Sequence, residues 1–139
     1  MKFTRNASAT WKGRIKAGMG TISTESGVLD AAKYGFATRF EDGKGTNPEE
    51  LIGAAHAGCY TMQLSAFLGE EDYNPENLHT EAKVTFEDGA VTKVHLTLTG
   101  KVPECSEDEF LKLANKAKEN CPISKLLKAE ITLDATLES

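Results

Sequence analysis

Three cysteines are the residues best suited to chemistry in this chain of 139 residues. Cys59 lies in the middle of AAHAGCYTMQLSAFL, residues 54–68, which reads as a helix with apolar side chains on nearly every side. Cys121 precedes Pro122 at the expected start of a short helix, where free backbone amides and the helix dipole favour a thiolate. Cys105 lies in the acidic loop VPECSEDEF, whose carboxylates disfavour a thiolate, and we expect it to be a bystander.

Cys59 has no comparable support from its own segment. It lies about three turns into its helix, and the influence of the helix dipole fades within the first turn. A reactive Cys59 therefore needs a cation, and the candidates are Arg39 and His56, which lies one turn earlier on the same helical face. Glu49 can hold such an arginine in place, but it precedes Cys59 by about ten helical residues, roughly 15 Å along the axis. A shared site needs a bridging arginine or a residue from a second subunit.

Several kinds of site remain open from these residues alone. Cys59 can be a small core residue, or part of an apolar seam that binds a ligand. His56 and Cys59 could serve a Cys-dependent hydrolase, although no oxyanion loop or nucleophile turn accompanies them. They could also bind zinc with His79, His95 or Cys121, but the H-x-x-C spacing alone is a weak indication of a metal. No phosphate-binding loop or dinucleotide glycine motif occurs, so we expect no cofactor.

The composition predicts one soluble globular domain covering residues 1–139, with 40% hydrophobic and 27% charged residues. The net charge is −5, and the 16 basic residues are scattered among 21 acidic ones, which argues against nucleic acid as a partner. The segment MKFTRNASATWKGRIK has no apolar core of a signal peptide, and no run approaches the ~20 apolar residues of a transmembrane helix. We therefore expect a cytoplasmic protein with no membrane partner.

The segments that must position these residues begin with three expected strands. NASATWKG, TISTESG and YGFATRF alternate polar and apolar residues and are separated by glycine-containing turns. In the third segment the aromatic residues share one face and Arg39 points to the other. A helix follows from Pro48 to about Leu68, capped by Asn47 and ended by Gly69.

This central helix is apolar around its whole circumference, so it must be covered on every side. A domain of this size has few elements with which to surround it. The small residues of the helix would let another backbone approach closely; they are Gly53, Ala54, Ala55, Ala57 and Gly58. We therefore expect that a second subunit completes the cover, in a homodimer.

The second half of the chain alternates strands and helices. Residues 79–102 predict a hairpin around the turn pair Asp88-Gly89. A capping box at Ser106 and Glu109 opens the amphipathic helix FLKLANKAKEN, the short helix PISKLLK follows, and AEITLDATLE predicts a closing strand. This order indicates an α+β fold in which a long buried central helix packs on antiparallel sheets.

Four segments together resemble a known family. STESGVL (23–29), the segment from Tyr34 to Glu70, ENCPIS (119–124) and LKAEITLDATL (127–137) are similar to the OsmC branch of the OsmC/Ohr family of thiol peroxidases. The combination of TNPEEL, a helical cysteine and a distant Cys-Pro pair is the most specific part. The resemblance implies an intertwined homodimer with two active sites at its interface. It also implies an antioxidant enzyme of the stress response that reduces organic hydroperoxides to alcohols.

The resemblance implies a role for each site residue. Cys59 matches the peroxidatic cysteine and Cys121 the resolving one. Arg39 matches the arginine that stabilises the thiolate, Glu49 matches the carboxylate that orients it, and Arg14 is the alternative arginine. The implied cycle passes through a Cys59 sulfenic acid and a redox-active Cys59–Cys121 disulfide, which an external dithiol reduces, with a lipoylated protein as the implied donor. The residues alone favour Cys121 as the thiolate, whereas the resemblance assigns the attack to Cys59.

Overall fold

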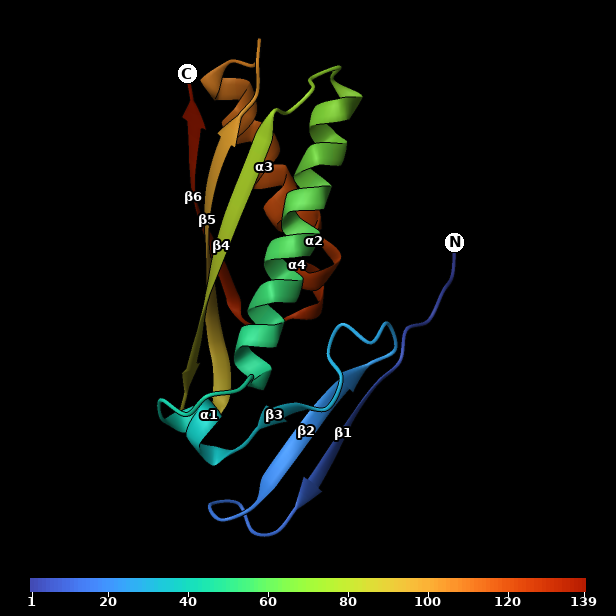
Figure 1. The fold of residues 1–139 in the computed structure, drawn as a ribbon. Coiled ribbons are helices and arrows are strands. Elements are labelled where there is room, and N and C mark those ends of the chain that lie inside the picture. Colours follow the sequence, from blue (N-terminus) through green and yellow to red (C-terminus); the bar gives the residue numbers. More distant parts are fainter. The chain divides into compact units, whose positions relative to one another are not determined.

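The computed structural model describes residues 1–139, and the chain divides into two units, Met1–Leu51 and Ile52–Ser139. The first unit contains an antiparallel sheet in the order β1-β2-β3, made of β1 (Ala7–Lys12), β2 (Met19–Thr24) and β3 (Ala32–Tyr34) (Figure 1). Trp11 and Tyr34 flank Gly20 on the central strand, and their rings meet edge to face with centroids 5.6 Å apart. A Cβ atom at Gly20 would lie 2.7 Å from the Trp11 ring, so only glycine leaves room for this pair.

The segment YGFATRF is not a strand beyond its first residue, so the prediction of a third strand reaching Phe40 is wrong. Residues Phe36–Phe40 form a short helix, α1. The Gly35 N–H donates to Thr38 Oγ1 at 2.8 Å and the Thr38 hydroxyl donates to the Gly35 carbonyl at 3.0 Å, which closes one helical turn. The alternating aromatics also fit a helix, because Phe36 and Phe40 are neighbours on one face with ring centroids 5.0 Å apart. Arg39 therefore lies in the last turn of a helix.

The long central helix, α2, spans Pro48–Glu70 and begins as predicted. Asn47 Oδ1 accepts a hydrogen bond from the Glu50 N–H at 2.7 Å, and Pro48 takes the first position. Neither α2 nor any other helix is both long and apolar enough to cross a membrane. In the single chain only one stripe of α2 is buried, made up of Gly53, His56, Tyr60, Leu64 and Leu68. The other faces remain at least partly accessible, and Met62 is 76% exposed.

The second unit is built on a sheet in the order β4-β5-β6. β4 (Asn77–Glu87) and β5 (Ala90–Lys101) form the predicted antiparallel hairpin, with Asp88 and Gly89 in its turn at φ values of 51° and 79°. β6 (Glu130–Glu138) pairs with β5 in parallel, so the prediction of antiparallel strands is wrong for this pair. The chain returns from β5 through α3 (Glu107–Asn120) and α4 (Pro122–Leu126), and such a helical crossover joins parallel strands (Figure 1).

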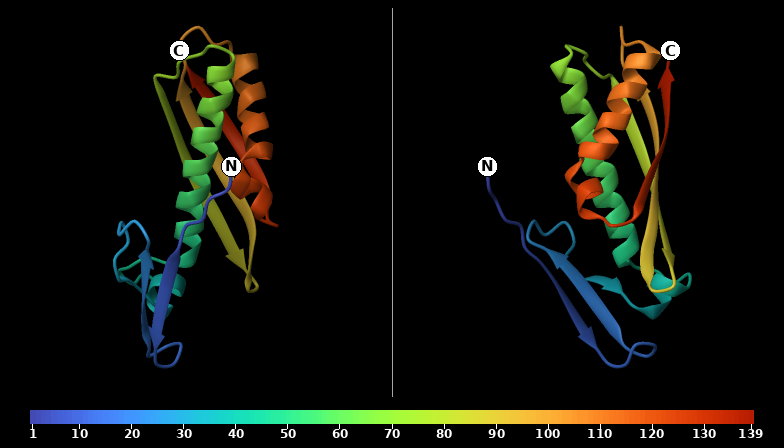
Figure 2. Two further views of the ribbon diagram at one scale, coloured as in Figure 1. Left: turned by 90° about the vertical axis from the view of Figure 1, so that its right-hand side faces the viewer. Right: turned by 180° about the vertical axis from the view of Figure 1, so that it is seen from behind.

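Residues 52–70 of α2 pack beside α3 on one face of this sheet (Figure 2). Ser106 caps α3 as predicted, with its Oγ accepting from the Glu109 N–H at 3.2 Å. The Tyr60 hydroxyl donates to the Ala114 carbonyl at 2.9 Å and joins the two helices. The buried core is made of Leu64 and Leu68 from α2, Val94, Leu96 and Leu98 from β5, and Phe110, Leu113 and Ala117 from α3. The predicted α+β class is confirmed, with two small sheets and a long central helix.

Candidate active site

Cys59 and Cys121 meet between α2 and α4. Cys59 is half-buried on α2, whereas Cys121 is fully buried at the junction that ends α3 and caps α4. The two thiols lie within hydrogen-bonding reach of each other, and both are free. Two cysteines that are distant in the sequence are therefore neighbours in the reduced fold, a point that the sequence alone leaves open.

The surroundings of the Cys59 thiol shift its pKa in opposite directions. Burial raises the pKa of Cys59, because a thiolate is disfavoured in an apolar place. The backbone N–H of Ile123 donates a hydrogen bond to the Cys59 sulfur and lowers the pKa, while the neighbouring Cys121 raises it. The net pKa is raised, and all of these groups lie within residues 52–139. A reactive thiolate at Cys59 therefore requires a further positive group.

The amide that reaches Cys59 comes from the first turn of α4. The sequence predicts free amides at the start of this helix and assigns their influence to Cys121, the cap residue. Cys121 is indeed the N-cap, but its side chain makes no capping hydrogen bond. Ile123, the second residue of the helix, donates its N–H to Cys59 instead. The backbone support expected for one cysteine therefore reaches the other.

Arg39 and Glu49 form a bidentate ion pair within residues 1–51. The Nε of Arg39 donates to Oε1 of Glu49 at 3.0 Å, and its Nη2 donates to Oε2 at 2.9 Å. Glu49 lies in the first turn of α2, where the helix dipole also favours a carboxylate. Hydrogen bonding to Glu49 raises the pKa of Arg39. The two parallel bonds fix the plane of the guanidinium as well as its place, as the sequence suggests for this pair.

An apolar hollow of about 260 Å³ adjoins Arg39 in the same unit. The Arg39 guanidinium carbon lies 5.3 Å from the centre of the Phe40 ring. Arg14, the alternative arginine, is exposed in the turn between β1 and β2. The Glu49 carboxylate binds Arg39, so Arg39 is the better candidate for an arginine that Glu49 orients. The side chains that line the hollow with Arg39 are Trp11, Ile15, Tyr34, Phe36 and Phe40.

His56, the other candidate cation from the sequence, is fully buried on α2. Burial lowers the pKa of His56, so the imidazole is neutral near pH 7 and does not supply the positive charge. Its Nε2 lies 2.7 Å from Oγ of Ser124 on α4, and its Nδ1 is buried without a hydrogen-bond partner. The sequence does not identify Ser124 as a site residue, because its only signal is its place three residues after Cys121.

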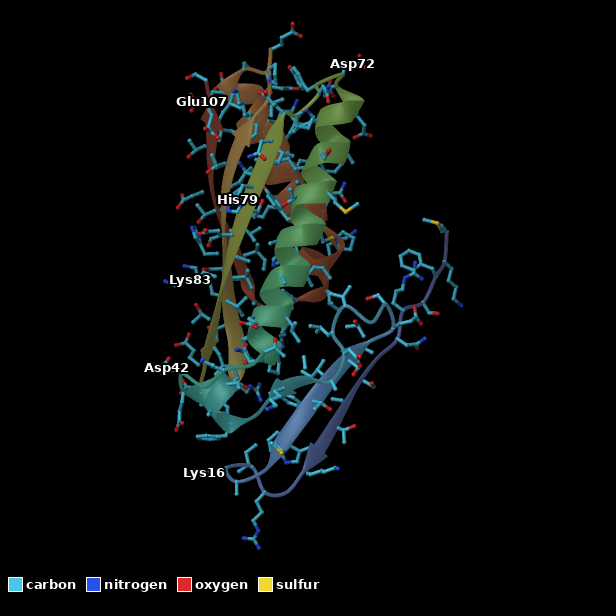
Figure 3. All side chains as sticks on the ribbon, viewed as in Figure 1. Lys16, Asp42, Asp72, His79, Lys83 and Glu107 are labelled. Carbon is cyan, nitrogen blue, oxygen red and sulfur yellow. The ribbon has the colours of Figure 1, made fainter.

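The remaining histidines lie on the sheet of the second unit. His79 and Lys83 are exposed on β4 (Figure 3). His95 on β5 contacts Thr132 Oγ1 at 2.6 Å and Asp134 Oδ2 at 3.1 Å, both on β6. No group of three or more His, Cys, Asp or Glu side chains is placed to hold a metal ion.

The pKa of Cys105 is raised, as the sequence predicts, although burial contributes more than the carboxylates of its loop. Burial raises the pKa of Cys105, and the Glu109 carboxylate raises it further. A hydrogen bond with Tyr73 acts in the opposite direction without reversing the shift. This thiol is therefore poorly suited to attack a substrate.

Comparisons with known proteins identify relatives of this chain. Residues 41–136 match the family model described as OsmC-like protein. The chain is 50% identical to Peroxiredoxin OsmC of Escherichia coli (strain K12), with 100% of both chains covered. It is 27% identical to the organic hydroperoxide resistance protein OhrB of Bacillus subtilis (strain 168), with 86% of this chain and 89% of the relative covered. The crystal structure of an OsmC-like protein from Mycoplasma pneumoniae shares the fold, with a TM-score of 0.79 at 14% identity over 100% of both chains. The chain therefore belongs to the OsmC-like protein family.

Proposed function

We propose that this protein is a thiol-dependent peroxidase that reduces organic hydroperoxides to alcohols. The proposal rests on the pairing of Cys59 with Cys121, with the Ile123 N–H on the Cys59 sulfur. A thiol beside a second thiol can reduce a peroxide and end as a disulfide rather than as a more oxidised acid. Two relatives carry names of this kind, a peroxiredoxin in Escherichia coli and an organic hydroperoxide resistance protein in Bacillus subtilis.

The proposed cycle has three steps. The Cys59 thiolate attacks the distal oxygen of the hydroperoxide, the O–O bond breaks, and the alkoxide takes a proton and leaves as the alcohol. Cys59 is then a sulfenic acid, which the Cys121 sulfur attacks, so that the hydroxyl leaves as water and a disulfide forms. An external dithiol reduces this disulfide by exchange and becomes oxidised itself. Cys121 is already buried beside Cys59, which suits it to the second step.

We assign Arg39 and Glu49 to the first step. The surroundings of Cys59 within residues 52–139 raise its pKa, so a guanidinium beside the sulfur would be needed to favour the thiolate. The Arg39–Glu49 pair belongs to residues 1–51 and Cys59 to residues 52–139. We propose that an intertwined homodimer brings the pair to the thiol, and that the two units of each chain form a single OsmC-like domain over residues 1–139.

The uncovered face of α2 supports this homodimer. The exposed residues of that face are apolar or small, and a second helix could approach them closely. They include Ala54, Ala55, Gly58, Met62 and Ala66. Sedimentation equilibrium of the purified protein should give the mass of two chains, and the mass of one chain would remove this part of the proposal.

The hollow beside Arg39 suggests the class of peroxide. Its aromatic lining offers a place near the guanidinium for the apolar substituent of an organic hydroperoxide. Hydrogen peroxide has no such substituent. We therefore expect cumene hydroperoxide to react faster than hydrogen peroxide. The reductant would be a dithiol, with a lipoylated protein as the candidate donor. Because such a cycle needs a supply of reduced thiols, we place the activity in the cytoplasm.

The test is dithiol-dependent consumption of cumene hydroperoxide by the wild type and by Cys59→Ser, Cys121→Ser and Cys105→Ser. We expect Cys59→Ser to be inactive and Cys105→Ser to match the wild type, since the pKa of Cys105 is raised and its loop is acidic. After one equivalent of peroxide, the intact mass of the wild type should show the loss of two hydrogens, and Cys121→Ser should instead gain oxygen on Cys59.

Three outcomes would contradict the proposal in different ways. An active Cys59→Ser with an inactive Cys121→Ser would exchange the roles of the two cysteines. Turnover of an activated ester without any dithiol would indicate a Cys-dependent hydrolase. A wild type that consumes no hydroperoxide, yet binds apolar ligands equally well without its cysteines, would indicate a binding protein.

A further inference from the structure

A partly buried hydrogen bond joins the two helices that meet at the thiols. Nε2 of His56 on α2 lies 2.7 Å from Oγ of Ser124 on α4. His56 precedes Cys59 by three residues, and Ser124 follows Cys121 by three. The bond therefore lies about one helical turn from each cysteine and connects the same two elements. The proposed chemistry uses neither side chain.

Burying an imidazole at this position costs free energy, so packing alone does not explain the presence of His56. His56 is fully buried, and its Nδ1 has no partner. An apolar residue of similar size would avoid leaving a buried polar atom without a hydrogen bond. Since an unpaired buried N–H is rarer than an unpaired acceptor, we assign the proton to Nε2, which then donates to Ser124 Oγ. The bond to Ser124 is therefore what distinguishes histidine from an apolar residue here.

The helix that accepts this bond has few other attachments. α4 is five residues long, and none of its residues is buried. Lys125 and Leu126 are exposed, while Ile123 packs against the core and donates its N–H to the Cys59 sulfur. The bond to Ser124 is thus a directed side-chain attachment of the first turn of α4 to α2, in addition to the packing of Ile123. Cys121, the cap of that turn, is buried in the core and donates its N–H to the Ala117 carbonyl of α3 at 2.9 Å. The bond to Ser124 adds a restraint from the α4 side of this residue.

We propose that His56 and Ser124 are positioning residues for the disulfide-forming step and hold Cys121 against Cys59 while Cys59 is a sulfenic acid. This proposal rests on the proposed function. Without the bond the first turn of α4 moves more freely, and Cys121 meets the sulfenic sulfur less often. A second hydroperoxide then transfers its distal oxygen to the sulfenic acid, leaves as the alcohol and produces a sulfinic acid.

The first experiment measures how much of the Cys59 sulfenic acid becomes disulfide and how much becomes sulfinic acid. The protein is oxidised by increasing cumene hydroperoxide without dithiol, and intact mass gives the ratio of disulfide to sulfinic acid. We expect His56→Ala and Ser124→Ala to lower this ratio about tenfold, the effect of losing one hydrogen bond. Ser124→Thr, which keeps a hydroxyl, should restore most of it, and Lys125→Ala, on the exposed side of α4, should match the wild type.

The second experiment does not depend on peroxide chemistry. Each folded variant, checked by near-ultraviolet circular dichroism, is equilibrated with reduced and oxidised glutathione, and the equilibrium constant for the Cys59–Cys121 disulfide is measured. We expect this constant to fall about tenfold in His56→Ala and Ser124→Ala. Values equal to or above that of the wild type in both experiments would overturn the positioning role and leave the peroxidase intact. A wild type that is inert to hydroperoxide but forms the disulfide would reject the peroxidase, and the equilibrium constants would then decide the positioning role.

Discussion

Replacing Glu49 by glutamine tests how Arg39 is used, because it removes the charge and keeps the size. The carboxylate accepts two hydrogen bonds from Arg39, at 3.0 and 2.9 Å, and its side chain is only 16% exposed. A glutamine keeps one accepting oxygen and presents an NH2 group to the second donor, so one bond is lost and the other is made to a neutral acceptor. A hydrogen bond to a charged group contributes about 1.5–3 kcal/mol. The lower end applies because the Arg39 side chain is 36% exposed.

We therefore expect kcat/KM for cumene hydroperoxide to fall about tenfold in Glu49→Gln and further in Arg39→Ala. The pKa of Cys59, followed by the pH dependence of its alkylation in the assembled protein, should rise in both variants. Glu50→Gln is the matched control, since the Glu50 carboxylate accepts from the Thr46 hydroxyl at 2.9 Å instead. An Arg39→Ala variant with unchanged kcat/KM and unchanged alkylation would refute the assignment of the guanidinium. An effect of Glu50→Gln equal to that of Glu49→Gln would refute the orienting role of Glu49.

Three other variants test the fold around the site. Gly100→Ala should lower the free energy of unfolding by about 1–3 kcal/mol in urea, because its Cβ would lie 2.8 Å from the Phe110 ring; an unchanged midpoint would show that the ring can move aside. Tyr60→Phe should lower it by about 1–3 kcal/mol, since it removes the buried bond to the Ala114 carbonyl at 2.9 Å, and equal stability would mean that the carbonyl finds another donor. His56 should make the wild type less stable as pH falls below 6.5, by up to about 1.4 kcal/mol per pH unit, because burial lowers its pKa and the unfolded chain binds the proton first. In His56→Gln, urea midpoints measured between pH 7 and pH 5 should no longer fall with pH in this way. A pH dependence that persists in the variant would show that other groups cause it.

Local sequence signals predict those elements whose limits depend on adjacent residues. The start of α2 follows from Asn47 and Pro48, and the β4–β5 turn follows from Asp88 and Gly89. α1 was missed because aromatic residues at alternate positions fit a short strand and also a helical turn. The parallel pairing of β6 was missed because the direction of a strand depends on the path of the connection, which periodicity does not report.

The contacts of the candidate site also differ in how well local sequence predicts them. The pairing of Arg39 with Glu49 could be anticipated, because an acidic residue in the first turn of a helix is a natural partner for a nearby arginine. The bond between His56 and Ser124 joins positions far apart in the chain, and a serine in a short helix carries no distinguishing pattern. The donation of the Ile123 amide to Cys59 depends on the packing of α4, so sequence reasoning assigned that support to Cys121.

The path of the chain through the second sheet sets an order for folding during synthesis. The β4–β5 hairpin can close once Lys101 has emerged, because its strands are adjacent in sequence. β6 reaches the other edge of β5 only after residues 102–129 have crossed over as α3 and α4. Until then that edge of β5 presents unpaired N–H and C=O groups beside the apolar side chains of Val94, Leu96 and Leu98. A chain delayed on the ribosome after α3 is therefore exposed to pairing with a neighbouring chain, and aggregation is the expected fate of the unfinished protein.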